Sequence, residues 1–262
     1  MSEQKVITEQ RGQVLLIGLN RPAKYNAFDL ESYHLLAQAY GQLEHDPRLR
    51  CGVVYGSGEH FTSGLDLPQW TDSFATGHWP ALTPQQRDPF RLDPARQLSK
   101  PLVFAAHGIC FTVAIELMLA GDIRIAADNC RFGQIEVRRG IYACGGATVR
   151  MVQEFGWANA QRYLLTGDEF NAAEALRIGL VQEVVPLGQQ LERAIAIAEK
   201  IARQAPLGVY ASLRSSRIAV EEGVRAAIDR MLPDLAPIMK STDVLEGVQS
   251  FIERREAKFQ GK

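Results

Sequence analysis

Net charge is almost absent from this chain of 262 residues, because 29 Lys and Arg residues are balanced by 30 Asp and Glu residues. Proteins that bind nucleic acid or dock on an anionic membrane normally carry a clear basic excess. We therefore expect neither a nucleic-acid nor a membrane partner. With 46% hydrophobic and 23% charged residues, the composition is that of a globular protein large enough for one sizeable core.

Cysteine is also scarce. The four cysteines, Cys51, Cys110, Cys130 and Cys144, form no CxxC pair, which argues against a zinc site and a disulfide framework. The first thirteen residues lack the apolar stretch of a secretory signal. These features predict a cytoplasmic protein with reduced thiols and no metal site.

Only residues 101–121 form an apolar run that is nearly long enough to cross a bilayer. His107, Gly108 and Glu116 interrupt this run, so a buried strand, a turn and a buried helix explain it better. The chain also lacks a Walker-type loop, a dinucleotide fingerprint and a recognisable Ser/His/Asp arrangement.

Hydrophobic periodicity predicts an α/β core that is followed by a helical layer. Apolar segments predict strands at 13–19, 52–55, 101–106 and 122–126, and helical spacing predicts helices at 27–40, 112–120, 145–155, 171–177, 190–204, 207–218 and 220–232. Residues 66–99 show no periodicity and contain five prolines. A loop of this length is either a flap over a binding site or an insertion without a function.

Glu116 is the first candidate functional residue. Its predicted helix is apolar on every face, so this carboxyl group is expected to be buried. Burial raises the pKa of a carboxyl group and can tune it for acid–base chemistry near neutral pH. A structural role is the alternative, in which Glu116 caps a backbone group or pairs with a cation such as Arg124.

Glu136 follows a strand-like segment and precedes a turn at Gly140. Taken alone, it is expected to be a solvated loop carboxylate. Two carboxylates beside one substrate atom can divide the roles of acid and base. Their spacing along the chain does not show that they meet in space.

Two segments could supply backbone hydrogen-bond donors. Gly64 lies between a strand and the aperiodic loop, and Thr112–Ala114 begins the buried helix, where N–H groups are free. Two such groups aimed at one oxygen would form an oxyanion hole. A plain turn and a plain helix start are the simpler interpretations. Structural roles are also expected for Asp66, Asp122, His107 and Cys144.

Taken together, these segments resemble the crotonase, or enoyl-CoA hydratase/isomerase, family. The resemblance runs through 19–27 (LNRPAKYNA), 53–67 (VVYGSGEHFTSGLDL), 100–122, 130–146 (CRFGQIEVRRGIYACGG), 165–186 and 246–262. It implies an α/β fold with a crotonase-like core of repeated β-β-α units and an acyl-CoA site at 1–200, then a helical trimerisation region at 201–262. It also implies homotrimers or homohexamers, with coenzyme A as part of the substrate.

The resemblance further implies an enoyl-CoA hydratase, which adds water across the 2,3 double bond of a 2-enoyl-CoA. The N–H groups of Leu65 and Val113 would form the oxyanion hole, and Glu116 and Glu136 would be the catalytic pair. The positions implied to contact the substrate are Lys24, Ala27, Ser63, Gly64, Asp66, Leu67, Gly108, Thr112, Cys144, Phe251 and Arg254. Phe251 and Arg254 would approach the adenine end, often from a neighbouring subunit.

Three departures from the family pattern keep other reactions open. Thr112–Ala114 replaces a run of glycines, which permit close approach of the backbone to a ligand. Pro68 replaces a basic residue, and Cys144 stands where dienoyl-CoA isomerases have an aspartate, which argues against that branch. The alternatives are an enoyl-CoA isomerase, an acyl-CoA thioester hydrolase and a non-catalytic acyl-CoA-binding subunit.

Overall fold

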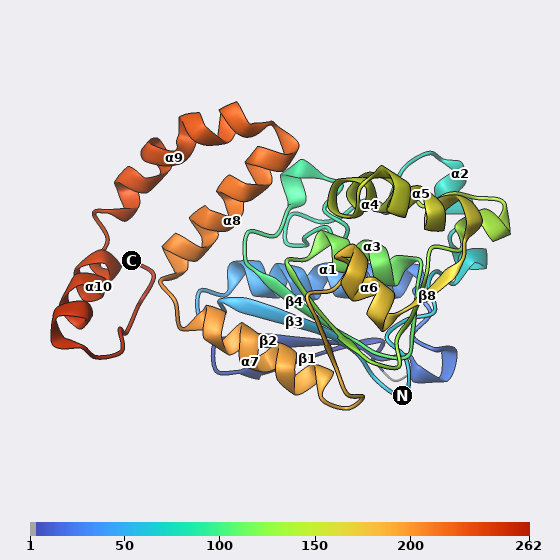
Figure 1. The fold of residues 1–262 in the computed structure, drawn as a ribbon, viewed down its shortest axis with the longest axis horizontal. Helices are drawn as coiled ribbons and strands as arrows, with labels where there is room; N and C mark the ends of the chain where they lie inside the picture. The colour runs from blue at the N-terminus through green and yellow to red at the C-terminus, as the bar shows by residue number, and fades with distance from the viewer. Residues whose placement is uncertain (1–3) are drawn as a thin grey trace.

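The computed structural model describes residues 4–262, which form two β-sheets surrounded by helices (Figure 1). The larger sheet has the spatial order β1 (Val6–Arg11), β2 (Val14–Leu19), β3 (Cys51–Gly56), β4 (Leu102–Ala106), β6 (Ile123–Ala127) and β9 (Glu183–Val185). Its strands are parallel except β1, which is antiparallel to β2. The smaller sheet contains β5 (Ile109–Phe111), β7 (Arg131–Gly133) and β8 (Glu169–Asn171).

The helices lie on both faces of the larger sheet and beyond its edge. They are α1 (Leu30–His45), α2 (Thr71–Ala75), α3 (Val113–Ala120), α4 (Ala147–Phe155), α5 (Trp157–Thr166), α6 (Ala172–Ile178), α7 (Gln190–Ala202), α8 (Pro206–Glu221), α9 (Val224–Ile238) and α10 (Thr242–Glu253). Short 3-10 helices are η1 (Pro22–Lys24), η2 (Leu67–Gln69), η3 (Pro94–Arg96) and η4 (Glu136–Arg139). Within residues 4–262, no helix has the length and apolar character needed to cross a membrane.

Successive segments repeat a β-β-α arrangement, in which one strand joins each sheet before a helix follows. The units β4–β5–α3 and β6–β7–α4 show this repeat. The apolar run at 101–121 therefore becomes a strand, a turn, a second short strand and a helix, which confirms the prediction of a buried strand and helix. The predicted α/β core and the helical last third are also confirmed.

The central strands are buried on both faces, as parallel strands between helical layers usually are. On β2, Leu15 and Ile17 join the main core that contains α1 and α3, whereas Val14 and Leu16 pack under α7. Side chains alternate between the two faces of a strand, so one apolar segment serves both cores. Because both faces are buried, the strands are continuous apolar segments that the sequence analysis could recognise. Such a segment does not indicate which helix packs on which face of the sheet.

Periodicity missed several elements, including the edge strand β1 and helix α5. β1 has only one buried residue and forms an exposed edge strand, so it has no apolar signal. Helix α5 buries only Ala160, Tyr163 and Leu164, and its other faces are polar or exposed. The boundary between α8 and α9 was also placed wrongly, because the break falls at Gly223 and α9 continues through Pro233 to Ile238.

The aperiodic segment 66–99 is anchored to the core by aromatic side chains. Trp70 is fully buried and its indole N–H donates to the carbonyl oxygen of Phe28 at 2.7 Å. Tyr33 of α1 packs against Trp70, Trp79 and Phe90 at centroid distances between 5.8 and 6.2 Å. The segment is therefore docked on α1, close to the strand end from which Gly64 and Leu65 follow.

Helices α8, α9 and α10 extend away from the body, whereas α7 packs against the larger sheet (Figure 1). Many apolar side chains of the extended helices are exposed, with Phe251 at 85% and Leu232 at 75%. We propose that residues 201–262 form a separate helical region of the chain.

Candidate active site

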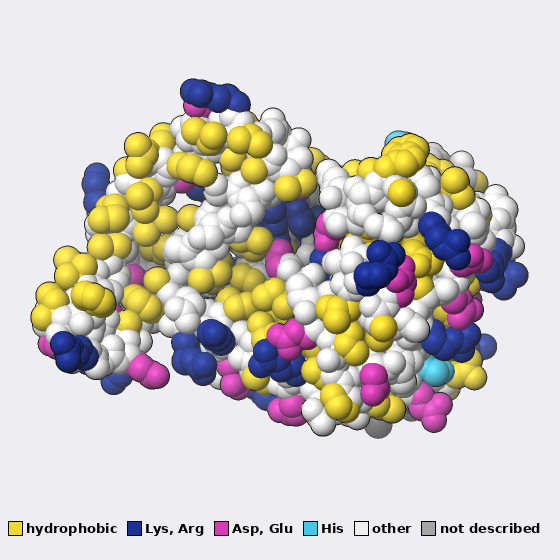
Figure 2. Space-filling model, in the orientation of Figure 1, with side chains coloured by type: hydrophobic (Ala, Val, Ile, Leu, Met, Phe, Trp, Pro, Cys, Tyr) yellow, Lys and Arg dark blue, Asp and Glu magenta, His cyan; other side chains and the backbone are white. Residues whose placement is uncertain are grey.

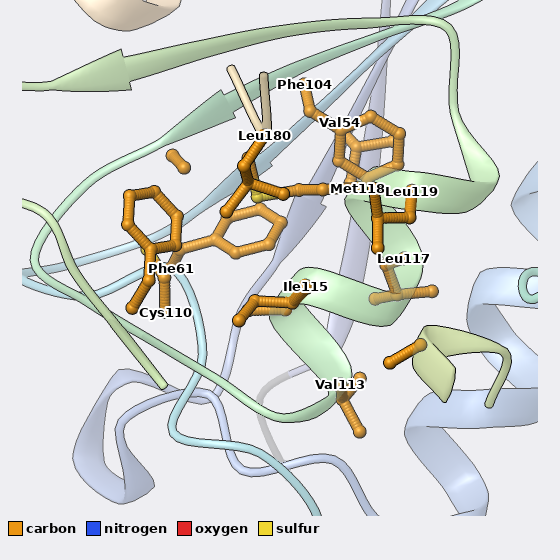
Figure 3. Close-up of a cluster of buried hydrophobic side chains, with 14 of the residues drawn as sticks. Val54, Phe61, Phe104, Cys110, Val113, Ile115, Leu117, Met118, Leu119 and Leu180 are labelled. Atoms are coloured by element: carbon orange, nitrogen blue, oxygen red, sulfur yellow. The ribbon is translucent and has the colours of Figure 1, made fainter. Parts of the chain in front are cut away.

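Helix α3 fixes Glu116 inside the main core. All eight of its residues are buried, and Figure 3 shows Ile115, Leu117 and Met118 pointing into the surrounding apolar cluster. Glu116 is only 3% exposed. Because its neighbours are hydrocarbon, the carboxyl group depends on a few backbone donors for hydrogen bonds.

Those donors come from the segment before α4. The N–H of Gly145 donates to Glu116 Oε1 at 2.6 Å, and the N–H of Ala147 lies 3.5 Å from the same atom. A Cβ on residue 145 would stand 2.5 Å from Glu116 Oε2, so the approach requires glycine. The alternative pairing with Arg124 is wrong, because Arg124 pairs with Glu154.

Glu136 begins the 3-10 helix η4 and is 7% exposed. The expectation from the residue alone, a solvated loop carboxylate, is wrong because η4 turns this side chain inward. Gln134 Nε2 donates to Glu136 Oε1 at 2.8 Å. Within the described chain, Glu136 Oε2 and Gln134 Oε1 are buried without a hydrogen-bond partner. Buried polar atoms of this kind are uncommon and often belong to functional sites.

The two glutamates interact electrostatically. Burial raises the pKa of Glu116 to about 8, and the charge of Glu136 contributes to that increase. Burial also raises the pKa of Glu136 to about 7. The half-buried Cys144 lies near both, since burial and then the two carboxylates raise its thiol pKa to about 11. A carboxyl pair with these pKa values can hold one proton near neutral pH, as acid–base catalysis requires.

Two backbone N–H groups near the start of α3 have no acceptor in the described chain. Val113 is the first residue of α3, and Leu65 lies between two backbone hydrogen bonds that join Phe28 to Gly64 and to Asp66. No acceptor in residues 4–262 binds the N–H of either Leu65 or Val113. A Cβ on Gly64 would stand 2.1 Å from Thr112 Oγ1, so the two donor segments are in contact. Such an arrangement can stabilise a developing oxyanion.

Thr112 departs from ordinary backbone geometry at this contact. Its φ of 49° and ψ of −102° are unusual for a β-branched residue. Its hydroxyl group is buried and has no partner among the described residues. The strain is therefore concentrated at the residue that precedes the free N–H of Val113.

The other predicted contact residues lie in three places. Lys24, Ala27, Ser63, Asp66 and Leu67 belong to two segments, 24–27 and 63–67, that hydrogen bonds join. The Ser63 N–H donates to the Tyr25 carbonyl, and Arg21 donates to the Ala27 carbonyl and pairs with Asp66 at 2.8 Å. Gly108 instead packs against Glu59 and His60. Phe251 and Arg254 lie at the end of α10, away from the body of this chain (Figure 1).

A cavity of about 330 Å³ lies beside Glu136 and was not predicted. Its wall is largely apolar and comprises Gln134, Glu136, Val137, Tyr142, Ala143, Thr148, Val152, Trp157, Gln161, Leu164 and Leu165. Several lining residues belong to α5, the helix that periodicity did not reveal. Gln134 and Gly145 were missed as well, although the Gly145–Gly146 pair before a helix was a usable signal.

Comparison with known proteins covers nearly the whole chain. The sequence profile described as enoyl-CoA hydratase/isomerase matches residues 9–262. An enoyl-CoA hydratase from Mycobacterium tuberculosis is 35% identical, over 98% of this chain and 96% of the relative. A carnitinyl-CoA dehydratase from Proteus mirabilis is 32% identical, over 96% of this chain and 97% of the relative.

Solved structures agree with these sequence relatives. The crystal structure of a probable enoyl-CoA hydratase/isomerase from Mycobacterium abscessus has a TM-score of 0.95 and 48% identity, covering 98% of this chain and 99% of that one. An enoyl-CoA hydratase structure from Mycobacterium tuberculosis H37Rv has a TM-score of 0.88 and 33% identity, covering 99% and 100%. The chain therefore belongs to the enoyl-CoA hydratase/isomerase, or crotonase, family and has the crotonase fold.

Proposed function

We propose that this protein is an enoyl-CoA hydratase that adds water across the 2,3 double bond of a 2-enoyl-CoA. The observation that carries the proposal is the pair of buried, mutually interacting glutamates, and the two free backbone N–H groups of Leu65 and Val113 support it. Relatives named hydratase or dehydratase support the same chemistry, because dehydration is the reverse reaction.

The thioester carbonyl oxygen accepts hydrogen bonds from the N–H groups of Leu65 and Val113. These bonds withdraw electrons, so C3 becomes electrophilic and negative charge at the oxygen is stabilised as the enolate forms. Losing one such donor costs about 3–4 kcal/mol of transition-state stabilisation in comparable sites. The free N–H at the start of α3 also benefits from the positive end of the helix dipole.

Glu116 and Glu136 handle the protons of this reaction. The ionised member of the pair accepts a proton from water as the oxygen attacks C3. The protonated member delivers a proton to C2. After the reaction, the glutamate that was ionised is protonated and the one that was protonated is ionised. The apolar cavity beside Glu136 receives the acyl chain, and the segment from Lys24 to Ala27 and the loop after Asp66 lie along the CoA moiety.

Hydration of a panel of trans-2-enoyl-CoAs, followed by the loss of the conjugated thioester absorbance, tests the proposal. We expect Glu116→Gln and Glu136→Gln each to lower kcat about 10²–10⁴-fold. The exposed Glu199→Gln in α7 is the matched control and should leave kcat unchanged. Activity that survives both active-site substitutions would contradict the assigned roles.

Isomerisation is the second candidate, and the strained Thr112 favours it because this residue alters the second oxyanion donor. Product analysis with 3-enoyl-CoAs separates isomerisation from hydration. Saturated acyl-CoAs test thioester hydrolysis in the same assay. Tight CoA binding without turnover on any substrate would instead indicate a non-catalytic acyl-CoA-binding subunit.

We also propose that the chain assembles into homotrimers or homohexamers. The exposed apolar residues of α9 and α10 support this assembly, since burying them needs a partner surface. The proposed role of Phe251 and Arg254 at the adenine end then requires a neighbouring subunit. Light scattering after size exclusion should give three or six times the 29.0 kDa chain mass. A monomer at micromolar concentration would exclude the assembly.

A further inference from the structure

A second cavity, of about 630 Å³, lies between α8, the end of α3, α4 and the loop 91–97. It is separate from the cavity beside Glu136, because the two share no lining residue. Figure 2 shows Lys and Arg side chains inside the hollow between the C-terminal helices and the body. The cavity wall contains four arginines from four different segments: Arg91, Arg124, Arg150 and Arg217.

Three carboxylates on the same wall neutralise three of these cations. The pairs are Arg91 with Glu221 at 2.7 Å, Arg217 with Asp122 at 3.0 Å, and Arg124 with Glu154. The wall therefore carries one positive charge more than it carries negative charges. The excess positive charge belongs to a half-buried side chain. An unpaired charge is less stable there than in water, because burial removes part of its hydration.

Arg150 is the cation without a carboxylate at ion-pair distance in the described part of the chain. Its guanidinium donates to the carbonyl oxygens of Gly145, at 3.4 Å, and Arg91, at 3.1 Å. Asp88 attracts it most strongly from a distance, followed by Glu116, Glu221 and Glu154. The Asp88 carboxylate already accepts the backbone N–H groups of the loop at positions 90, 92 and 93.

Two of the arginines also have a nitrogen atom without an acceptor. The Nε atoms of Arg91 and Arg217 are buried and unpaired within residues 4–262. Burial lowers the pKa of Arg91 to about 10, and the charges of Arg217 and Arg150 contribute, which places the three guanidiniums close together. Adjacent guanidinium groups repel each other, and a shared oxyanion relieves this repulsion through charge-assisted hydrogen bonds.

We propose that this cavity binds an oxyanion, a phosphate or carboxylate group, held by Arg150 together with Arg91 and Arg217. The anion is either a free ion or a carboxylate at the far end of an acyl chain, and the second source rests on the proposed function. The cavity adjoins the active site, because the Gly145 carbonyl oxygen accepts from Arg150 and the Gly145 N–H donates to Glu116.

Thermal unfolding of the full-length protein tests for the free anion. Inorganic phosphate or glutarate is titrated against sodium chloride of the same ionic strength. We expect the wild-type Tm to rise by about 2 °C or more at saturation, because a ligand that binds only the folded state stabilises it. Arg150→Gln should lose this rise, and the exposed Arg203→Gln in the same buffers should keep it.

A second variant tests the same cavity in case Arg150→Gln does not fold. Val149 lines the cavity and is 59% exposed, so Val149→Glu adds a tethered carboxylate without disturbing a buried side chain. This variant should also lose the phosphate-dependent rise. Equal stabilisation of wild type, Arg150→Gln and Val149→Glu would overturn the proposal, and so would a wild type that responds only to ionic strength.

The substrate source is tested by comparing 2-enoyl-CoAs that end in a carboxylate with methyl-ended ones of equal length. A preference for the carboxylate substrate in kcat/KM of tenfold or more, lost in Arg150→Gln, assigns the site to the acyl chain. Stabilisation by phosphate without that preference assigns it to a free anion, even if no hydratase activity is found. In a crystal structure of the assembled protein, an acidic side chain of a second copy could occupy the cavity. That result would overturn both the free anion and the acyl-chain carboxylate as its ligand.

Discussion

The N–H of Gly145 donates to Glu116 Oε1 at 2.6 Å, and no side chain fits between the two residues. This contact holds a carboxyl group in a core that offers it few other partners. It also ties the position of Glu116 to the segment that precedes α4, rather than to its own helix alone. Activity should therefore depend on residue 145 although that residue has no functional group.

The first prediction is that Gly145→Ala lowers kcat about 10²-fold or more. The new Cβ would lie only 2.5 Å from Glu116 Oε2, so the carboxylate must move away from its present position. Gly208→Ala is the control, since a Cβ there meets nothing within 4 Å and φ is not in the left-handed region. The control should retain wild-type kcat. Similar activity in both variants would show that the Gly145 contact does not position Glu116.

The second prediction concerns stability against pH. The folded chain keeps the Glu116 proton up to a pKa of about 8, whereas the unfolded chain loses it near 4.5. Stability from this group is therefore complete below pH 4.5 and is lost as pH rises toward 8, by about 1 kcal/mol per pH unit. Glu116→Gln should flatten this decline in denaturant unfolding between pH 5 and 8. Glu199→Gln should decline as wild type does.

The third prediction is that Gln134→Leu raises the pKa of Glu136. The amide hydrogen bond at 2.8 Å favours the charged carboxylate, so its loss favours the protonated form. The acidic limb of the kcat/KM profile should move upward by about one pH unit. The exposed Gln204→Leu should not move it. A lower kcat with an unshifted profile would indicate that Gln134 acts only through packing.

The fourth prediction is that Thr112→Gly costs less stability than is usual for truncating a buried threonine. Glycine adopts positive φ freely, so the change releases strain of about 1–3 kcal/mol while it removes side-chain packing. Thr62→Gly is the matched comparison, because Thr62 is buried and its hydroxyl is hydrogen-bonded to the Asn26 carbonyl. Denaturant unfolding should show a loss at least 1 kcal/mol smaller for Thr112→Gly. Equal losses would mean that Thr112 is not strained.

Some of the site could be predicted from residues alone and some from family resemblance. The apolar helix around Glu116 indicated burial, because no face of that helix suits water. The same reasoning made Glu136 a solvated residue, since its local sequence gives no sign that η4 turns inward. Its burial depends on packing against segments from elsewhere in the chain.

The amino-acid sequence by itself determined the α/β order, the buried strands and the desolvated Glu116, because hydrophobic periodicity is a local property. Only the tertiary structure decided that Glu136 is buried, that Gly64 contacts Thr112, and that four arginines from separate segments share one cavity. These relationships join residues that are far apart in the chain, so their geometry depends on how the sheets and helices pack. Periodicity carries no information about such contacts.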